Sequence, residues 1–418
     1  MTTTRHLLAA TAATAFVAGV SAAFAQDITL TIESWRSDDA ALWQETIIPA
    51  FEATNPGSRL NFVPTALGYD EGVEARLADG SAGDLIACRP FDAALYLYDK
   101  GYLLPLGDLP GMETFPALSR AAWSTDDGAA TFCVPMGASI HGFIFNKEIF
   151  DKLGLSAPKT VAEFHEVLDA LRDDGRYIPI ALGIADQWEA AAVGYQNIGP
   201  TYWKGEKGRQ ALIAGTQKLS DETWVAPYRE LARWRDYLGD GFTAQTYSDS
   251  QNLFTLGRAA IYPAGSWEIA GFSANANFEM GAFPPPVLKA GDRCVVAVQP
   301  EVGLGVNAES PHLEAAKTFL SFVASEAFAT AEANGSPGLF PFVGQPAITD
   351  PLAQEFASWL RECDVTLPWA SAPLSSGTPN LQEENRKAVA QVIKGAETPE
   401  TVAARLQAGL DGWYKPAQ

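Results

Sequence analysis

Two short stretches of the sequence place an indole beside a carboxylate. In the stretch GRAAIYPAGSWEIA, Trp267 directly precedes Glu268. In the other, Asp186 and Trp188 follow the apolar run 178–183. An aromatic face packs against the C–H face of a sugar ring, and a carboxylate accepts hydrogen bonds from its hydroxyls. These four side chains are therefore candidate ligand contacts, and a sugar is the ligand whose chemistry suits them.

The elements around Trp267 are expected to hold its ring at the end of a strand. Residues 257–265 begin as an apolar, strand-like run, which Pro263 and Gly265 then break. Ser266 suits the N-cap of a following helix, and such a junction leaves free backbone N–H groups. The alternative is that Trp267 is a core residue that closes this helix onto the sheet.

Further polar residues follow the strands predicted in the first third of the chain. The order there is β-α-β-α-β, with predicted strands at 27–35, 59–65 and 83–88. This order predicts an α/β fold with a mostly parallel sheet between helices, and ligands bind at the carboxyl edge of such sheets. The candidate contacts at this edge are Trp35, Arg36, Arg89, Asp92, Ser139 and His141.

Three of these residues also have a structural interpretation. Arg36 and Arg89 could form salt bridges that brace a loop, which are common on an acidic protein. His141 could be a hydrogen-bonded core histidine. If the two arginines instead faced a ligand, they could clamp an anion, which favours an acidic or phosphorylated solute.

The rest of the chain alternates strands and helices without a repeat or a flexible linker. Short, separate strands are expected at 130–135, 142–146, 178–183, 278–286, 295–298 and 303–306. Thr160 suits the N-cap of a helix at 161–172. The segment 195–237 is mainly helical, and its aromatic residues have a spacing typical of a buried stripe. At 418 residues the chain is too long for one core, so two lobes joined by crossing strands are expected.

Composition and charge exclude several classes of partner. The chain is 47% hydrophobic and 19% charged, which is typical of a folded globular protein. Its net charge of −21 argues against nucleic acid and anionic membranes as partners. Residues 1–25 have the charged start, the apolar run and the A-x-A end of a cleaved signal peptide. Because Gln26 rather than a cysteine follows, we expect a soluble periplasmic protein without a lipid anchor.

No motif in the sequence predicts a catalytic, metal or cofactor site. The histidines form no spaced cluster, and no phosphate-binding Gly-rich loop or G-x-S-x-G elbow is present. Asp186 and Glu268 could form the carboxylate pair of a glycosidase, but nothing in their spacing singles them out. The chain has four cysteines after the predicted signal peptide, Cys88, Cys133, Cys294 and Cys363. In an oxidising compartment they could form two disulfides, with three possible pairings, or they could be four buried thiols.

Several motifs occur in an order that belongs to a known family. They are IIPAF near the start, FNKEIF at 145–150, PKT at 158–160, FxxGRAAIYxxGSW at 254–267 and AAKxFL at 315–320. In this order they resemble the bacterial extracellular solute-binding proteins of the maltose-binding type, the sugar-capture subunits of ABC importers. The resemblance implies a type II-like periplasmic-binding-protein fold whose ligand lies in a cleft between two lobes. It assigns 27–133 plus 295–335 to the N-terminal lobe and 134–294 plus 336–418 to the C-terminal lobe.

The resemblance also implies roles for single residues. The stacking tryptophan of the family falls on Trp267, and its acid-and-aromatic pair falls on Asp186 and Trp188. A loop with charged and aromatic contacts falls on 88–92, and a late aromatic falls on Phe340. The acid that precedes the tyrosine-asparagine-lysine motif of the family is replaced here by a serine, Ser139, which points to a different sugar or pose.

The implied function is a periplasmic receptor that binds a mono- or oligosaccharide and delivers it to the membrane permease subunits of an ABC importer. No catalysis, cofactor, metal or nucleic acid is expected, and the protein is expected to be a monomer. Two alternatives remain open. The same fold could bind an anionic sugar derivative or a glycerol phosphodiester through Arg36 and Arg89, or the protein could be a periplasmic glycoside hydrolase.

Overall fold

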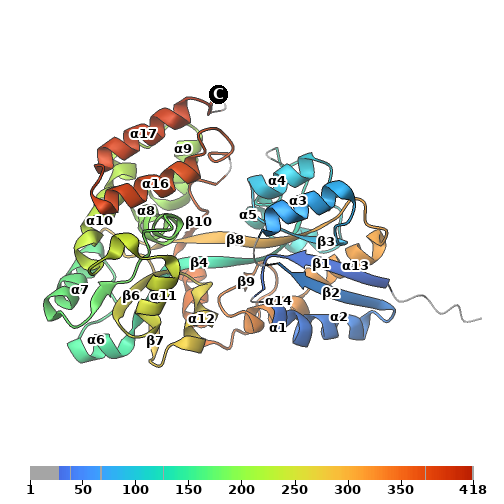
Figure 1. The fold of residues 1–418 in the computed structure, drawn as a ribbon, viewed down its shortest axis with the longest axis horizontal. Helices are drawn as coiled ribbons and strands as arrows, with labels where there is room; N and C mark the ends of the chain where they lie inside the picture. Colours follow the sequence, from blue (N-terminus) through green and yellow to red (C-terminus); the bar gives the residue numbers. More distant parts are fainter. Residues whose placement is uncertain (1–27, 38, 66–67, 126, 372, 417–418) are drawn as a thin grey trace, which may run out of the picture.

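The chain folds into two lobes that two long strands join (Figure 1). The computed structural model describes residues 28–37, 39–65, 68–125, 127–371 and 373–416. The lobe built on the first three strands is called the N-terminal lobe, and the other is called the C-terminal lobe. The predicted signal peptide lies outside the described residues. Within those ranges, no helix combines the length and the apolar character needed to cross a membrane.

Three parallel strands form the outer part of the N-terminal lobe. β1 (Ile28–Ser34) lies between β2 (Ser58–Pro64) and β3 (Leu85–Cys88) and pairs in parallel with both. Alternation along β1 buries Leu30 and Ile32 completely. The helices of this lobe are α1 (Ala40–Leu42), α2 (Ile48–Thr54), α3 (Tyr69–Asp79), α4 (Asp92–Asp99), α5 (Ala117–Ala121), α13 (Leu313–Val323) and α14 (Glu326–Gly335).

Two antiparallel strands cross between the lobes. β4 (Val134–Asn146) and β8 (Val295–Val306) pair side by side across the middle of the molecule (Figure 1). The prediction of four short strands here is wrong, because Pro300 and the glycines around it suggested breaks. Pro300 instead pairs with Ala138, next to a register shift in β4 where a missing backbone donor is tolerated.

The C-terminal lobe continues the same sheet. β6 (Ala259–Gly265) pairs antiparallel with β4 and parallel with β5 (Ile178–Ile180). The main strand order is β2-β1-β3-β8-β4-β6-β5, and β7 (Met280–Phe283), β9 (Phe340–Pro341) and β10 (Asp364–Thr366) pair beside it. The α/β class is confirmed. The prediction of a mostly parallel sheet is wrong, because β4 runs antiparallel to four of its neighbours, and β8 runs antiparallel to β3.

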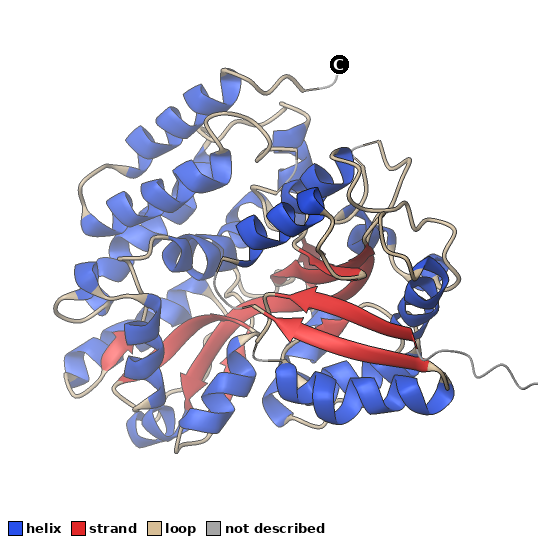
Figure 2. Cartoon of the chain, turned by 45° about the vertical axis from the view of Figure 1, so that its right-hand side comes forward, coloured by secondary structure: helices blue, strands red, loops and turns tan. Residues whose placement is uncertain are grey.

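Helices cover both faces of the strands (Figure 2). The C-terminal lobe holds α6 (Lys147–Leu153), α7 (Val161–Asp174), α8 (Gln196–Trp203), α9 (Gly205–Ile213), α10 (Glu222–Trp234), α11 (Tyr247–Thr255), α12 (Glu268–Asn275), α15 (Pro351–Glu362), α16 (Leu381–Lys394) and α17 (Pro399–Asp411). Thr160 caps α7 as predicted, in a capping box with Glu163. Single π- or 3₁₀-helical turns lie at Trp43–Ile47, Met112–Thr114, Ala190–Tyr195, Arg235–Tyr237 and Phe242–Ala244.

Each lobe has its own buried apolar cluster. One cluster draws on residues 30–136 and 302–343, and another draws on 143–283 and 369–410. The aromatic residues predicted to form a buried stripe in 195–237 do so, because Trp203, Trp224, Tyr228 and Trp234 are all fully buried. The cysteines form the pairs Cys88–Cys133 and Cys294–Cys363, one of the three pairings that the sequence left open.

Candidate functional site

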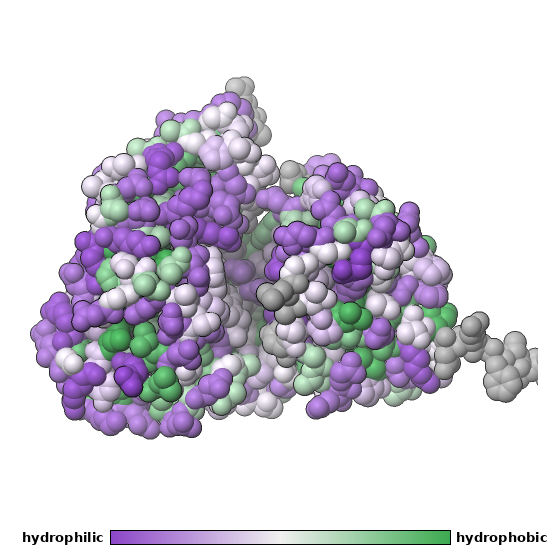
Figure 3. Space-filling view, viewed as in Figure 1, coloured by the Kyte–Doolittle hydropathy of each residue, from purple (hydrophilic) through white to green (hydrophobic). Residues whose placement is uncertain are grey.

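A cavity of about 370 Å³ lies between the lobes, and the surface there is hollowed (Figure 3). Residues 89–93 of the N-terminal lobe line one side. Residues of the C-terminal lobe, among them Trp188, Gln196 and Trp369, line the other side. We call this cavity the main cleft. Of the predicted contacts, the ones that line it are Arg89, Asp92 and Trp188.

Gln196 presents an unused hydrogen-bond donor in the wall of the main cleft. Its side chain is 4% exposed, and its Oε1 accepts a hydrogen bond from the backbone N–H of Trp369 at 3.0 Å. Its Nε2 has no partner among the described residues. Buried polar groups are nearly always paired, so an unpaired amide marks a place where a ligand oxygen can be accommodated.

Three aromatic side chains lie together in the C-terminal lobe, and one of them, Trp188, lines the main cleft. The rings of Trp188 and Tyr247 meet edge to face, with centroids 4.7 Å apart. Trp267 Nε1 donates to the Tyr247 hydroxyl at 3.3 Å and to Glu268 Oε1 at 3.1 Å. We call Trp188, Tyr247 and Trp267 the aromatic wall. Tyr247 is not among the predicted contacts, although it begins α11 after a capping box at Thr246.

A buried carboxylate holds two members of this wall in place. Glu268 is 3% exposed and accepts hydrogen bonds from Trp267, from the Tyr247 hydroxyl at 2.5 Å and from Gln251 at 2.8 Å. Burial raises the pKa of Glu268 above its ordinary value. The expectation that Glu268 offers its carboxylate to a ligand is therefore corrected. Its acceptors are directed at neighbouring side chains, because α12 turns it into the protein.

A second buried carboxylate lies behind the first. Glu189 is completely buried and accepts hydrogen bonds from Ser250 at 2.7 Å, from Tyr262 at 3.0 Å and from the Gly183 N–H at 2.8 Å. Tyr262 also donates to Glu268 at 3.4 Å, so one hydroxyl joins the two acids. Burial, with a smaller contribution from the neighbouring Glu268, raises the pKa of Glu189 to about 8. Glu189 is therefore protonated at neutral pH.

Asp186 and Ser266 have different roles from those expected. Asp186 is exposed, and its Oδ2 accepts from the backbone N–H of Tyr247 at 2.7 Å, which fixes the start of α11 beside the loop 184–188. Ser266 does not cap α12, which begins after Trp267. Its hydroxyl accepts from the Ile140 N–H at 2.9 Å and donates to the Gly338 carbonyl at 2.5 Å. It thereby ties β4 to the segment that precedes β9.

The opposite wall, in the N-terminal lobe, carries charges that are paired within that lobe. The Arg89 guanidinium lies 4.3 Å from the ring centroid of Trp35, and its Nε contacts both carboxylate oxygens of Asp70, at 2.8 and 2.9 Å. Arg36 forms a two-pronged ion pair with Asp39. The salt-bridge interpretation of both arginines is therefore confirmed.

The crossing strands β4 and β8 place a polar row between the two walls. Ser139 donates to Glu301 Oε1 at 2.6 Å, and Gln299 donates to the same oxygen at 3.0 Å. Burial raises the pKa of Glu301, while Arg36 and Arg89 lower it. Glu301 was missed because the run around Pro300 was predicted as a break between strands. The sequence signal that could have found Glu301 is a charged residue between two apolar, strand-like runs.

His141 belongs to the same row and is a core histidine. Its Nδ1 lies 2.9 Å from Asn197 Oδ1 and its Nε2 lies 3.3 Å from Gln299 Oε1. Its ring packs edge to face on Trp267, with centroids 5.3 Å apart. Burial lowers the pKa of His141 to about 4, so the ring is neutral at pH 7.

The predicted positions of Ser139, His141 and Phe340 need correction. Ser139 and His141 lie in the middle of a 13-residue strand and are completely buried, so they are not exposed at a strand end. Phe340 is buried in an apolar cluster with residues of β6 and α15, because β9 pairs with β4 and turns its ring inward. Asp92 is a side chain in direct contact between the lobes, because it accepts from the Ser375 hydroxyl at 2.6 Å.

Two residues beside the main cleft have a strained backbone. Phe91 and Gln187 have φ angles of 61° and 62°, a region that residues with a side chain rarely adopt. Phe91 precedes Asp92 and α4, and Gln187 lies between Asp186 and Trp188. Such strain costs about 1–3 kcal/mol per residue and gathers at functional sites. No group of three or more potential metal ligands occurs among the residues that the structure describes.

The fold and the cleft define a two-lobed ligand-binding protein. The model of the bacterial extracellular solute-binding protein family matches residues 34–330, and the chain belongs to this family. It is a family of binding proteins and not of enzymes.

Three comparisons place the chain among individual proteins. It is 25% identical over 297 residues to the multiple sugar-binding protein of Streptococcus mutans, which covers 68% of each chain. It is 24% identical over 225 residues to the polygalacturonan/rhamnogalacturonan-binding protein YtcQ of Bacillus subtilis, covering 50% of this chain and 44% of that protein. Its fold is similar to that of a chitin oligosaccharide binding protein, with a TM-score of 0.76, 21% identity and coverage of 92% and 98%.

Proposed function

We propose that this protein captures a mono- or oligosaccharide in the main cleft and delivers it to the permease subunits of an ABC importer. The observation that carries the proposal is the aromatic wall, whose rings are held by a buried carboxylate beside an interlobe cavity. Such rings offer apolar faces to a sugar, and nearby donors such as Gln196 Nε2 can meet its hydroxyls. The names of the relatives, which refer to several sugars and glycans, support the same class of ligand.

The proposal includes the location and the lobes. We propose that residues 1–25 are removed on export to the periplasm and that the mature chain works as a monomer. The lobe boundaries proposed are 27–133 plus 295–335 and 134–294 plus 336–418. The separation of the two apolar clusters supports a division into two lobes, and the N-terminal cluster extends past the proposed bounds to residues 134–136 and 339–343. Amino-terminal sequencing of the exported protein is expected to begin at Gln26, and a start at Met1 would contradict the export proposal.

The anionic alternative through Arg36 and Arg89 is not favoured by the main cleft. Both guanidinium groups already face carboxylates of their own lobe, Asp39 and Asp70. A ligand that replaced either carboxylate would have to break an existing ion pair. The hydrolase alternative is not favoured either, since Glu268 is enclosed by its own donors.

The test is a binding screen on the purified mature chain. Isothermal titration and tryptophan fluorescence would be measured with neutral oligosaccharides of galactose, glucose, xylose and N-acetylglucosamine, and with the corresponding uronates. We expect saturable binding of at least one sugar, a change in tryptophan emission and no release of products. Absence of binding to every carbohydrate tested would reject the proposed ligand class.

A further inference from the structure

A second interlobe cavity, of about 620 Å³, lies between α4 and α5 of the N-terminal lobe and α9 of the C-terminal lobe. Phe91 and Asp92 line both this cavity and the main cleft. The hydrogen bond from Ser375 to Asp92 therefore lies where the two spaces meet. We call this space the Arg120 cavity. It is the larger of the two and has no role in the function proposed above.

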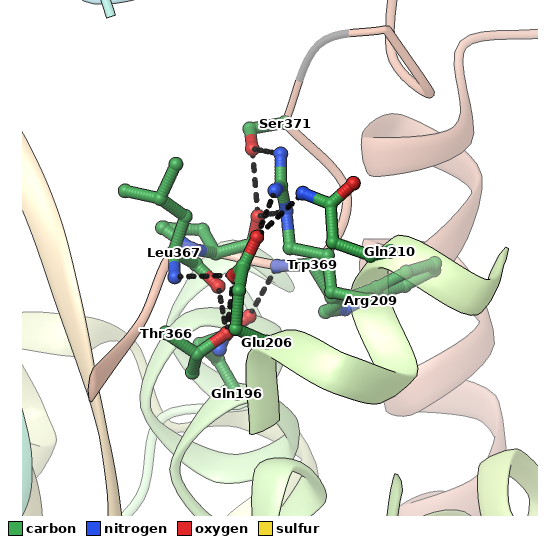
Figure 4. Close-up of polar contacts among 9 residues, drawn as sticks. Gln196, Glu206, Arg209, Gln210, Thr366, Leu367, Trp369 and Ser371 are labelled. Carbon is green, nitrogen blue, oxygen red and sulfur yellow. Dashed lines mark hydrogen bonds and ion pairs between the residues drawn. The ribbon is translucent and has the colours of Figure 1, made fainter. Parts of the chain in front are cut away.

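The two acids that line the Arg120 cavity are already occupied. Glu206 accepts from Arg209 at 2.8 Å, from Gln210 at 2.7 Å and from the Thr366 hydroxyl at 3.0 Å. Figure 4 shows these side chains of α9 gathered against the segment 366–371. Asp92, the other acid, accepts from Ser375. Glu206 is therefore paired with Arg209, whereas Asp92 is held by a neutral hydroxyl at the boundary with the main cleft.

Arg209, one of the two arginines of the cavity, belongs to this network. It is 4% exposed and also donates to the Pro368 carbonyl at 3.3 Å and to the Ser371 hydroxyl at 3.2 Å (Figure 4). These bonds hold the loop after β10 against α9. Arg209 is therefore a structural residue of the cavity wall.

Arg120, the remaining arginine, forms no ion pair within the part of the chain that the structure describes. Its Nε is enclosed without a hydrogen bond, and no ion pair joins its guanidinium to any described residue. The side chain is half-buried on α5, next to Ser124, Thr125 and Thr131 on the cavity wall. A partly buried guanidinium without a direct ion pair is costly, and a carboxylate satisfies its planar donors best.

We propose that the Arg120 cavity is a subsite for an acidic sugar unit, with the sugar carboxylate bound by Arg120. The cavity offers apolar side chains for the C–H face of a ring, among them Phe91 and Leu95, and hydroxyl groups beside the arginine for its polar edge. The strained backbone of Phe91, with φ 61°, holds this residue on the boundary with the main cleft. This proposal rests on the proposed function, since it extends the ligand class to oligosaccharides that carry a uronate.

The experiment compares matched acidic and neutral ligands by isothermal titration at low salt. The probes are galacturonate oligomers of two to four units and neutral galactose oligomers of the same lengths. We expect the wild-type chain to bind the acidic series about tenfold more tightly, which corresponds to about 1.4 kcal/mol. The Arg120→Gln variant should lose this preference and keep its affinity for the neutral series. Added salt should weaken the preference in the wild type.

Arg258→Gln is the matched control, because Arg258 is exposed, lies outside the cavity and has no ion pair or side-chain hydrogen bond. It removes the same charge and should leave both affinities unchanged. If Arg120→Gln does not fold, hydrogen exchange of the wild type replaces it, with protection of residues 117–131 expected when trigalacturonate binds.

The remaining outcomes separate the two proposals. Any of three results would overturn the acidic subsite and leave the proposed function. These are equal affinities of the wild type for neutral and acidic oligomers, an equal loss of affinity for both series in Arg120→Gln, and no protection of residues 117–131 from hydrogen exchange. Absence of binding to every carbohydrate would end both.

Discussion

Two side-chain clusters, which reach the main cleft through Arg89 and Trp188, are held in place by different physical means. In the N-terminal lobe, Arg89 and Asp70 form an ion pair in which both side chains are about half exposed. In the C-terminal lobe, Trp267 and Tyr247 donate to Glu268, which is buried. Exposed ion pairs are worth little, whereas a buried acceptor that is removed leaves its donors unpaired at a high cost. The aromatic wall should therefore be rigid, and the charged wall should tolerate change.

The largest effect is expected from Glu268→Ala. It leaves the Tyr247 hydroxyl, Trp267 Nε1 and Gln251 Nε2 without their shared acceptor, so unfolding free energy should fall by about 2–4 kcal/mol. Chemical denaturation measures this loss, and Glu268→Gln, which keeps an acceptor oxygen, should lose less. If Glu268→Ala were as stable as the wild type, the aromatic wall would not depend on the buried acid.

The next effect is expected on binding and comes from Trp267→Ala. Removal of a ring that contacts the ligand should cost about 1–2 kcal/mol, or roughly tenfold in affinity. Titration of the sugar found in the screen measures it. Leu256→Ala is a control at an exposed apolar position outside the main cleft. An unchanged dissociation constant for Trp267→Ala would remove this residue from the site and leave Trp188 as the candidate stacking ring.

The same contrast explains which parts of the structure the sequence could predict. The periodicity of α7 and the buried stripe of α10 were predictable because local spacing determines which face is buried. The crossing strands were not, because Pro300 indicates a break unless its partner, Ala138, is known to lie at a register shift. The length of β4 and β8 depends on their pairing with each other, and the local sequence of either segment does not predict this pairing.

The residues of the candidate site also differ in whether the local sequence could predict them. Trp188 and Trp267 could be predicted from the local sequence, because each is a large aromatic residue just after an apolar, strand-like run. The role of Glu268 could not, since adjacent residues on a helix point about 100° apart and only the fold shows which one is turned inward. Tyr247, Glu189 and Glu301 act through partners far away in the sequence, so no local motif marks them.

A smaller effect concerns pH and the acid behind the aromatic wall. The pKa of Glu189 rises from 4.5 to about 8 in the folded chain. Above about pH 5 the unfolded chain releases a proton that the folded chain keeps, so stability falls as pH rises towards 8. Glu189→Gln cannot lose this proton and should make that decline smaller in thermal unfolding scans. The remainder is expected from other acids whose pKa burial raises, among them Glu332, with a pKa of about 8, Glu268 and Glu301. An identical pH profile in the variant and the wild type would exclude Glu189 as a titrating group.

The smallest effect is expected from the charged wall. Arg89→Gln removes the ion pair with Asp70 and the contact of the guanidinium with Trp35, both at a partly exposed position. Its unfolding free energy should change by less than about 1 kcal/mol, since solvent and salt screen exposed pairs. Chemical denaturation at low and high salt measures the change, and Arg229→Gln, at another exposed ion pair, is the control. A loss as large as that of Glu268→Ala would show that both walls are equally rigid. The cleft would then have to close by moving whole lobes, with no adjustment of the charged wall around the ligand.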